Sequence, residues 1–86
     1  MILSVIIPVF NEEKTVAELL KKVTLVKLPP GFQKEIIVVD DGSTDKSRLV
    51  IQNSKLKGIK KIFHEKNAGK GAAINSGLKA AGGEFI

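Results

Sequence analysis

Short apolar stretches alternate with amphipathic ones along this chain. Residues 3–9 and 36–39 are mostly apolar and of strand length, whereas residues 59–64 come closer to an alternation of apolar and polar side chains. A strand that is apolar on both sides is typical of a parallel sheet covered by helices. The alternation at residues 59–64 predicts a more exposed strand, at the edge of that sheet.

The segment after the first predicted strand has the spacing of an amphipathic helix. Apolar side chains recur there every three or four residues up to about Val26. Asn11 is a good N-cap with acidic residues behind it, and the Pro-Pro-Gly of residues 29–31 ends the segment. We therefore expect a helix that begins after Asn11 and ends near Val26.

A second helix is expected after the second strand. Ser43 or Thr44 would cap its start, and roughly aligned apolar residues continue to about Leu56. Gly58 would close it as a C-terminal glycine. The strand at residues 59–64 follows at once.

A third helix is expected at about residues 71–81. It is rich in small side chains, which let a helix lie close to a sheet, and we attribute Gly71 and Gly77 to close packing. Residues 84–86 then begin a fourth strand. The order β-α-β-α-β-α-β predicts an α/β fold: one domain over residues 1–86, with a parallel Rossmann-like sheet and flanking helices. Because the chain stops inside an element, we expect it to be a fragment.

Composition narrows the class of protein. An apolar fraction of 43% over 86 residues suffices for a small core, so intrinsic disorder is not expected. The absence of cysteine excludes a disulfide framework and a thiolate metal site, and agrees with a reducing compartment. Residues 1–7 are apolar but lack a basic leader and are too short to span a bilayer, so we interpret them as a strand.

The chain is basic, with a formal charge of +5. Arg48 is the only arginine among 14 basic residues, and the aromatic side chains are four phenylalanines. Nucleic-acid binders usually carry more arginine and more stacking rings, so we expect no nucleic-acid partner. A solvated surface and a surface near anionic lipid both remain open. Nucleic-acid binding is kept only as a weaker alternative, through Lys55, Lys57, Lys60, Lys61 and Lys66.

The candidate chemistry begins where the second strand ends. Asp40 and Asp41 follow four β-branched residues directly, at the carboxyl end of a strand where open α/β sheets bind ligands. Two carboxylates there need water or a partner. The first strand-to-helix turn has no glycine, which excludes a dinucleotide fingerprint, and residues 69–71 lack the spacing of a phosphate loop. A phosphoacceptor receiver domain would want an acid after the third strand, where this chain has His64.

Each of these residues also has a purely structural interpretation. Asp41 and Ser43 could form only the turn and cap of a strand-to-helix corner. Glu12 could be a first-turn acid that the helix dipole favours. Lys70 could be a solvated loop lysine. We assign His64 no functional role.

Four blocks of the chain, taken together and in order, resemble the start of family 2 glycosyltransferases. They are residues 4–12, residues 35–45, residues 67–77 with the pattern Asn-x-Gly-Lys-Gly-x-Ala-x-Asn-x-Gly, and Gly83-Glu84. Within that family, the blocks are most similar to the branch of dolichol-phosphate and polyprenyl-phosphate mannosyltransferases. The resemblance spans essentially the whole chain and implies the N-terminal half of a glycosyltransferase A fold.

The resemblance implies a donor site at the carboxyl ends of the first strands. In it, apolar side chains would wall the base and ribose, carboxylates would accept base N–H groups and ribose hydroxyls, and a lysine beside Gly69 would lie near the phosphates. The implied residues are Pro8, Val9, Phe10, Glu12, Val39, Asp40, Asp41 and Lys70. Asp40 and Asp41 would thus serve the nucleotide and not a metal.

The remaining machinery would lie outside this chain. The family's Asp-x-Asp motif, which holds Mg²⁺ or Mn²⁺, would follow Ile86, as would the base that activates the acceptor. The implied enzyme transfers a sugar, with inversion, from a nucleoside diphosphate sugar to a polyprenyl phosphate, dolichyl phosphate or glycan acceptor. Its expected place is the cytoplasm, including the cytoplasmic face of a membrane for the whole protein. We expect no catalytic residue within the 86 residues and no transfer by them alone.

Two expectations concern alternatives and assembly. A non-catalytic α/β module that binds a nucleotide or a protein partner would carry the same framework. In the implied fold the first strand is central and pairs with the fourth. A short fourth strand would leave an apolar edge at residues 3–7, which predicts self-association.

Overall fold

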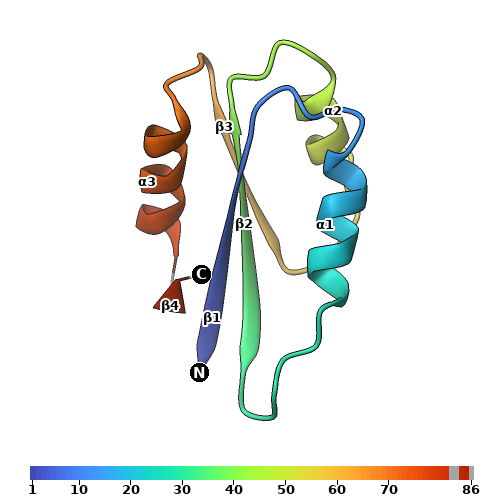
Figure 1. Ribbon diagram of the computed structural model, residues 1–86, viewed down its shortest axis with the longest axis vertical. Helices are drawn as coiled ribbons and strands as arrows, with labels where there is room; N and C mark the ends of the chain where they lie inside the picture. The colour runs from blue at the N-terminus through green and yellow to red at the C-terminus, as the bar shows by residue number, and fades with distance from the viewer. Residues whose placement is uncertain (82–83, 86) are drawn as a thin grey trace.

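Four parallel strands form the centre of the molecule. The structure is a computed structural model that describes residues 1–81 and 84–85 (Figure 1). Its strands are β1 (Ile2–Val9), β2 (Gln33–Asp41), β3 (Ile59–His64) and β4 (Glu84–Phe85). They are ordered β3-β2-β1-β4 in one sheet. The predicted parallel sheet is confirmed, with β3 at an edge and β1 between β2 and β4.

Helices cover both faces of this sheet. Helices α1 (Val16–Leu25) and α2 (Ser47–Gln52) lie on one face, and α3 (Lys70–Ala80) lies on the other (Figure 1). The predicted order of strands and helices is therefore confirmed. None of the helices in the described part of the chain is long and apolar enough to cross a membrane.

Both faces of strand β2 are buried, which explains why its sequence is apolar on both sides. Ile36 and Val38 belong to the core cluster that includes Val16 and Leu20 of α1, whereas Ile37 and Val39 belong to a second cluster with Ala73 of α3. Because successive side chains of a strand point to opposite faces, the four consecutive aliphatic residues serve both layers. The uniform apolar run is thus the mark of a strand buried on both faces.

Helix α3 lies close to the sheet at Gly77. A Cβ built on this glycine would come within 2.4 Å of Ile6 Cγ2. Close packing, predicted for the glycines of this helix, is therefore confirmed at Gly77. At Gly71 it is wrong, since a Cβ there would meet nothing within 4 Å.

The predicted start of the first helix is wrong. Helix α1 begins at Val16 with Thr15 at the N-cap position, five residues after Asn11. Asn11 has a left-handed backbone (φ 53°), and its Oδ1 accepts hydrogen bonds from the backbone N–H groups of Thr44 and Asp45. Asn11 therefore stabilises the loop before α2 and not its own helix.

The second helix is shorter than predicted at both ends. It begins at Ser47, and Asp45 Oδ1 accepts the N–H of Ser47 at 2.8 Å. It ends at Gln52, so Gly58 (φ 78°) is not its C-terminal glycine and lies in the turn before β3. The predicted N-caps Ser43 and Thr44 fail because their hydroxyl groups bond to Asn11 in the loop after β1.

Lysines from the strands reach the C-terminal ends of all three helices. Lys34 of β2 donates to the carbonyls of Val23 and Thr24, both at 2.7 Å, and to that of Val26. In β3, Lys61 bonds the carbonyls of Gln52 and Ser54, and Lys60 bonds that of Ala80. An ammonium group there satisfies carbonyls that lack a helical partner and complements the negative end of the dipole.

These contacts bear on the nucleic-acid alternative. Lys60 also forms an ion pair with Glu35 at 3.1 Å, and Lys61 holds two carbonyl groups. Two of the five lysines proposed for that alternative are thus engaged within the fold. Part of the basic charge of the chain is structural.

We expect Lys34→Met to destabilise the protein by roughly 1–2 kcal/mol, because three carbonyls lose a charged donor. Lys27→Met is the matched control, since Lys27 is exposed on the loop that follows α1, the helix whose end Lys34 caps. Urea denaturation of both variants measures the difference. Equal stability of the two would contradict a capping role for Lys34.

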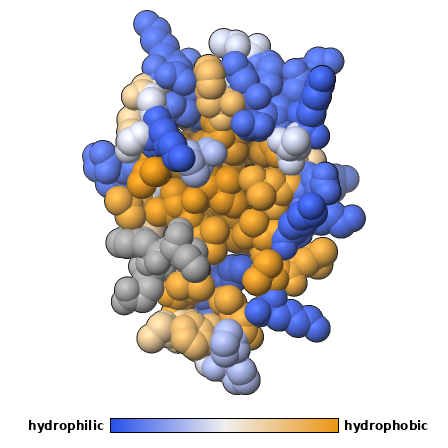
Figure 2. Space-filling model, viewed as in Figure 1, coloured by the Kyte–Doolittle hydropathy of each residue, from blue (hydrophilic) through white to orange (hydrophobic). Residues whose placement is uncertain are grey.

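The free side of β1 is apolar. Strand β4 pairs with β1 only at Leu3 and Ser4 in the described part of the chain. Figure 2 shows apolar atoms gathered in the middle of the molecule, over the region between α3 and α1, with hydrophilic side chains around the rim. Self-association through this side of β1 stays a prediction.

Candidate functional site

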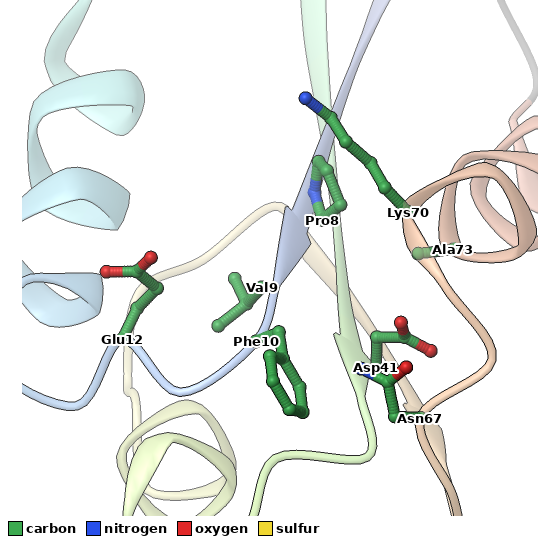
Figure 3. A pocket seen from close by; sticks show the side chains of 8 residues that line it. All are labelled: Pro8, Val9, Phe10, Glu12, Asp41, Asn67, Lys70 and Ala73. Carbon is green, nitrogen blue, oxygen red and sulfur yellow. The ribbon is translucent and has the colours of Figure 1, made fainter.

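A pocket lies at the carboxyl ends of β1 and β2, beside the start of α3. Its volume is about 350 Å³. The residues that line it come from three segments far apart in the sequence (Figure 3). They are Pro8, Val9, Phe10, Glu12, Asp41, Asn67, Lys70 and Ala73. The pocket thus opens at the edge where parallel sheets carry ligand sites.

The structure brings most of the predicted site residues together. Those that line the pocket are Pro8, Val9, Phe10, Glu12, Asp41 and Lys70. Val39 and Asp40 are not among the residues that line it, and both are fully buried, at 0% exposure. Asn67 and Ala73 line the pocket but were not predicted, although both stand in the third block of the family resemblance.

Asp40 and Asp41 have different surroundings despite being adjacent. The alternation of β2 places Asp41 on the α3 face, with Ile37 and Val39, and Asp40 on the opposite face. Asp40 Oδ2 accepts the N–H of Ser43 at 3.4 Å, and its Oδ1 has no hydrogen-bond partner among the described residues. Asp40 is therefore part of the corner between β2 and α2, away from the pocket.

Asp41 is held by three donors. Its Oδ1 accepts the N–H of Ala68 at 3.0 Å and the Nδ1 of His64 at 2.8 Å, and its Oδ2 accepts the N–H of Gly69 at 2.9 Å. The N–H of Ala68, followed by His64 and the N–H of Gly69, lowers the pKa of Asp41 against the opposing effect of burial. Asp41 is thus an ionised carboxylate at the edge of the pocket.

His64 has a structural partner on each side. Its Nδ1 meets Asp41, and its Nε2 lies 2.8 Å from the Oγ of Ser76 on α3. Sequence reasoning assigned this residue no role. The signal that could have found the contact is the register of the sheet, which pairs Asp41 with His64 at the ends of β2 and β3.

The loops after β1 and β2 are tied together. The N–H of Asn11 donates to Ser43 Oγ at 3.0 Å, and Asn11 Oδ1 accepts from the second loop in return. The N–H of Glu12 donates to the buried Ser47 Oγ at 2.7 Å. These reciprocal bonds position the first loop, and with it Phe10 and Glu12, at the mouth of the pocket.

Glu12 is not a first-turn acid. Helix α1 begins four residues later, and the backbone carbonyl of Glu12 accepts the N–H groups of Thr15 and Val16. Glu12 lines the pocket, and its Oε2 accepts the hydroxyl of Thr15 at 3.1 Å. The dipole interpretation of this residue is therefore wrong.

Lys70 brings positive charge to the same pocket. It is exposed and is the first residue of α3, so its ammonium group and the positive end of the helix dipole are close together. Carboxylates at Glu12 and Asp41 lie elsewhere on the wall (Figure 3). The pocket can thus receive a ligand that combines hydrogen-bond donors with an anionic group.

The described part of the chain does not offer a metal site. No group of three or more histidine, aspartate or glutamate side chains there is placed to hold a metal ion. Asp41 is occupied by backbone N–H groups and His64, and Asp40 is buried on the other face. These carboxylates do not form a metal centre.

A pocket with apolar and charged residues at the carboxyl edge of a covered parallel sheet is typical of α/β proteins that have a ligand site there. The chain belongs to glycosyl transferase family 2, whose sequence profile matches residues 4–86. The predicted membership of this family is therefore confirmed.

Relatives and solved structures agree with this assignment. An uncharacterised glycosyltransferase of Rickettsia conorii is 46% identical over 98% of this chain and 13% of its own length. An undecaprenyl-phosphate 4-deoxy-4-formamido-L-arabinose transferase of Pseudomonas aeruginosa is 34% identical over 99% of this chain and 26% of its own length. The chain thus spans about a quarter or less of these relatives.

The fold is that of known glycosyltransferases. TarS of S. aureus in complex with UDP-GlcNAc matches 100% of this chain and 26% of its own, with a TM-score of 0.82 and 36% identity. A mannosyltransferase of Pyrobaculum calidifontis in complex with GDP-Man and Mn²⁺ matches 92% of this chain and 24% of its own, with a TM-score of 0.76 and 26% identity. The predicted N-terminal part of a glycosyltransferase A fold is confirmed.

Proposed function

We propose that this chain forms the donor-nucleotide half of an enzyme that transfers a sugar, with inversion, from a nucleoside diphosphate sugar to an acceptor. The observation that carries the proposal is the pocket itself, which combines an apolar wall, two carboxylates and an ammonium group at one sheet edge. A nucleoside diphosphate has matching parts: a flat base, N–H and hydroxyl donors, and an anionic diphosphate.

Each part of the nucleotide has matching side chains in the pocket. The ring of Phe10 is 44% exposed and, with Pro8, offers an apolar surface for the base. The carboxylates of Glu12 and Asp41 accept hydrogen bonds from base N–H groups and ribose hydroxyls. Lys70, at the start of α3, attracts the diphosphate as a point charge.

Val39 and Asp40 have an indirect part in this proposal. Both are fully buried behind the pocket, so they support the strand that carries Asp41 and do not touch the nucleotide. The direct contacts with the base proposed for them from the family resemblance are replaced by contacts with Phe10, Glu12 and Asp41.

The acceptor, the metal and the location are proposals for the whole protein. The P. aeruginosa relative, an undecaprenyl-phosphate 4-deoxy-4-formamido-L-arabinose transferase, supports the polyprenyl-phosphate branch of the family. The proposed acceptor is therefore a polyprenyl phosphate or dolichyl phosphate, with a glycan as the alternative. Such an acceptor places the enzyme at the cytoplasmic face of a membrane. Mg²⁺ or Mn²⁺ would neutralise the leaving diphosphate, held by residues other than the described ones.

The test is a titration of the whole protein with UDP, GDP, dTDP and their nucleosides, by calorimetry in EDTA. We expect Lys70→Ala to weaken diphosphate binding about three- to tenfold and to leave nucleoside binding unchanged, because only the diphosphate meets the ammonium group. Lys79→Ala, at the far end of the same helix, is the matched control.

Two results would contradict the proposal. One is the absence of binding of any of the three nucleotides by the wild type, both in EDTA and with Mg²⁺ or Mn²⁺ present. The other is an equal loss of nucleoside and diphosphate affinity in Lys70→Ala. Binding of a nucleotide without sugar transfer by the whole protein, supplied with Mg²⁺ and a lipid phosphate, would favour the non-catalytic module.

A further inference from the structure

We propose that His64 and Ser76 are positioning residues for the nucleotide pocket. They hold Asp41 in one orientation and, through it, the loop that contains Asn67 and leads to Lys70, the first residue of α3. The inference rests on the proposed function for its link to nucleotide binding, whereas the hydrogen-bonded chain itself does not depend on that function.

The chain of contacts runs from α3 through β3 to β2. Ser76 Oγ lies 2.8 Å from His64 Nε2, and His64 Nδ1 lies 2.8 Å from Asp41 Oδ1. The side chain of His64 is 19% exposed and that of Asp41 is 4% exposed, so water competes little for these bonds. Both ring nitrogens of the histidine are therefore used within the fold.

The chemistry of the partners determines the tautomer of His64. Asp41 is ionised and accepts only, because its hydrogen bonds with Ala68, His64 and Gly69 lower its pKa. The proton of a neutral imidazole must then be on Nδ1, which leaves Nε2 as an acceptor for the hydroxyl of Ser76. Ser76 thus favours the tautomer that donates to Asp41.

The same order of serine, histidine and carboxylate occurs in hydrolytic triads, but the placement here is different. Neither His64 nor Ser76 lines the pocket, and Ser76 lies inside α3, where backbone N–H groups bond to the preceding turn of the helix. A nucleophilic serine needs a substrate beside it and free donors for the oxyanion. We therefore assign His64 and Ser76 a positioning role and not a catalytic one.

Asp41 transmits the position of His64 to the pocket. The N–H groups that it accepts belong to Ala68 and Gly69, which stand between the pocket residues Asn67 and Lys70. The two oxygens of Asp41 offer about four acceptor sites, and three of these sites are occupied by donors from the described residues. One acceptor site is left for a donor of the ligand, and its direction depends on how His64 holds the carboxylate.

The decisive comparison is between two isosteric variants of His64, measured with the whole protein. The amide nitrogen of Asn occupies the place of Nδ1, and that of Gln occupies the place of Nε2. We expect His64→Gln to weaken binding of UDP or GDP, whichever the wild type binds, by about tenfold. His64→Asn, which retains the donor to Asp41, should stay within about threefold of the wild type. Ser76→Ala should fall between these values.

A second readout is independent of any ligand. The imidazole ¹⁵N signals of His64 in the whole protein are assigned by their loss in His64→Asn. We expect the Nδ1–H tautomer, and amide shifts of Ala68 and Gly69 that change in His64→Gln and are retained in His64→Asn. The exposed Lys79→Ala variant should change none of these signals.

The outcomes separate the two proposals. Failure of the wild type to bind UDP, GDP or dTDP would overturn the proposed function and leave the positioning of Asp41 to be decided by the NMR signals. An Nε2–H tautomer in the wild type would overturn the positioning inference. So would His64→Asn and His64→Gln variants with the same nucleotide affinity.

Discussion

Replacing Gly42 with alanine is expected to destabilise the protein by roughly 2–5 kcal/mol, the largest effect on folding that we predict. Gly42 has a left-handed backbone (φ 71°), which costs an L-residue about 1–2 kcal/mol. A Cβ there would also lie 2.4 Å from the backbone N of Asn67. Backbone atoms cannot rotate away as a flexible side chain can, so the loop itself must move.

Gly58 is a matched control that separates the cost of the left-handed backbone from the cost of the close approach to Asn67. Its φ is 78°, close to that of Gly42, but a Cβ there would meet nothing within 4 Å. Gly58→Ala should therefore cost only about 1–2 kcal/mol. Urea denaturation of both variants measures the stabilities. If Gly42→Ala is no less stable than Gly58→Ala, the close approach of the two loops is not important for folding.

The substitution of Gly42 also bears on function. The segment that the new methyl group would displace contains Asn67, which lines the pocket, and precedes the N–H groups that Asp41 accepts. Residual folded Gly42→Ala protein is therefore expected to bind nucleotide more weakly than folded Gly58→Ala protein.

The second large effect is expected at Asp41. Asp41→Asn and Asp41→Ala should each weaken nucleotide binding at least about tenfold in EDTA, because a ligand acceptor and the anchor of the pocket loop are lost together. Glu65→Gln is the control, since Glu65 is an exposed carboxylate just before the same loop. Calorimetric titration of the whole protein measures these affinities. A loss that occurs only when Mg²⁺ or Mn²⁺ is present would assign Asp41 to the metal instead.

The stability of the same variants should depend on pH in a defined direction. The N–H of Ala68, with His64 and Gly69, lowers the pKa of Asp41 in the folded protein. A lowered folded pKa contributes stability that is present above the unfolded value, about 3.9, and is lost as the pH falls through the folded value. The deficit of Asp41→Asn relative to the wild type should therefore be full at pH 7 and should shrink below about pH 4.

The architecture could be predicted from the sequence because it depends on local patterns. The uniform run of residues 36–39 favours a strand covered on both faces, and the more polar residues 59–64 favour a strand at the edge of the sheet. The intervening helical spacing leads to parallel crossovers. These features depend on residues that are close in the sequence. The order β3-β2-β1-β4 follows from them together with the family resemblance.

Most of the residues that line the pocket had been implied by the family resemblance. Pro8 and Asp41 lie at the carboxyl ends of β1 and β2, Phe10 and Glu12 follow β1, and Lys70 begins α3. The carboxyl edge of a parallel sheet gathers such residues. The alternation of β2 already contained the separation of Asp40 from Asp41, but the pair was interpreted as one unit. Its two side chains lie on opposite faces.

The helix ends and the second layer of contacts were decided only by the tertiary structure. Asn11 bonds to Thr44 and Asp45, more than 30 positions away, so no local capping rule could place it. The role of His64 comes from its contacts with Asp41 and Ser76, which lie 23 and 12 positions away on other elements. Short side chains reach only a few ångströms, so their partners are known only once the chain has folded.

The sequence by itself thus determined the strands, the helices, the parallel sheet and the edge of the sheet that carries the pocket. The tertiary structure decided which side chains satisfy one another there: His64 on Asp41, Asn11 on the second loop, and the lysines of β2 and β3 on the helix ends. The physical reason is range. Hydrophobic periodicity acts between neighbours in the chain, whereas hydrogen bonds and charges act between neighbours in space.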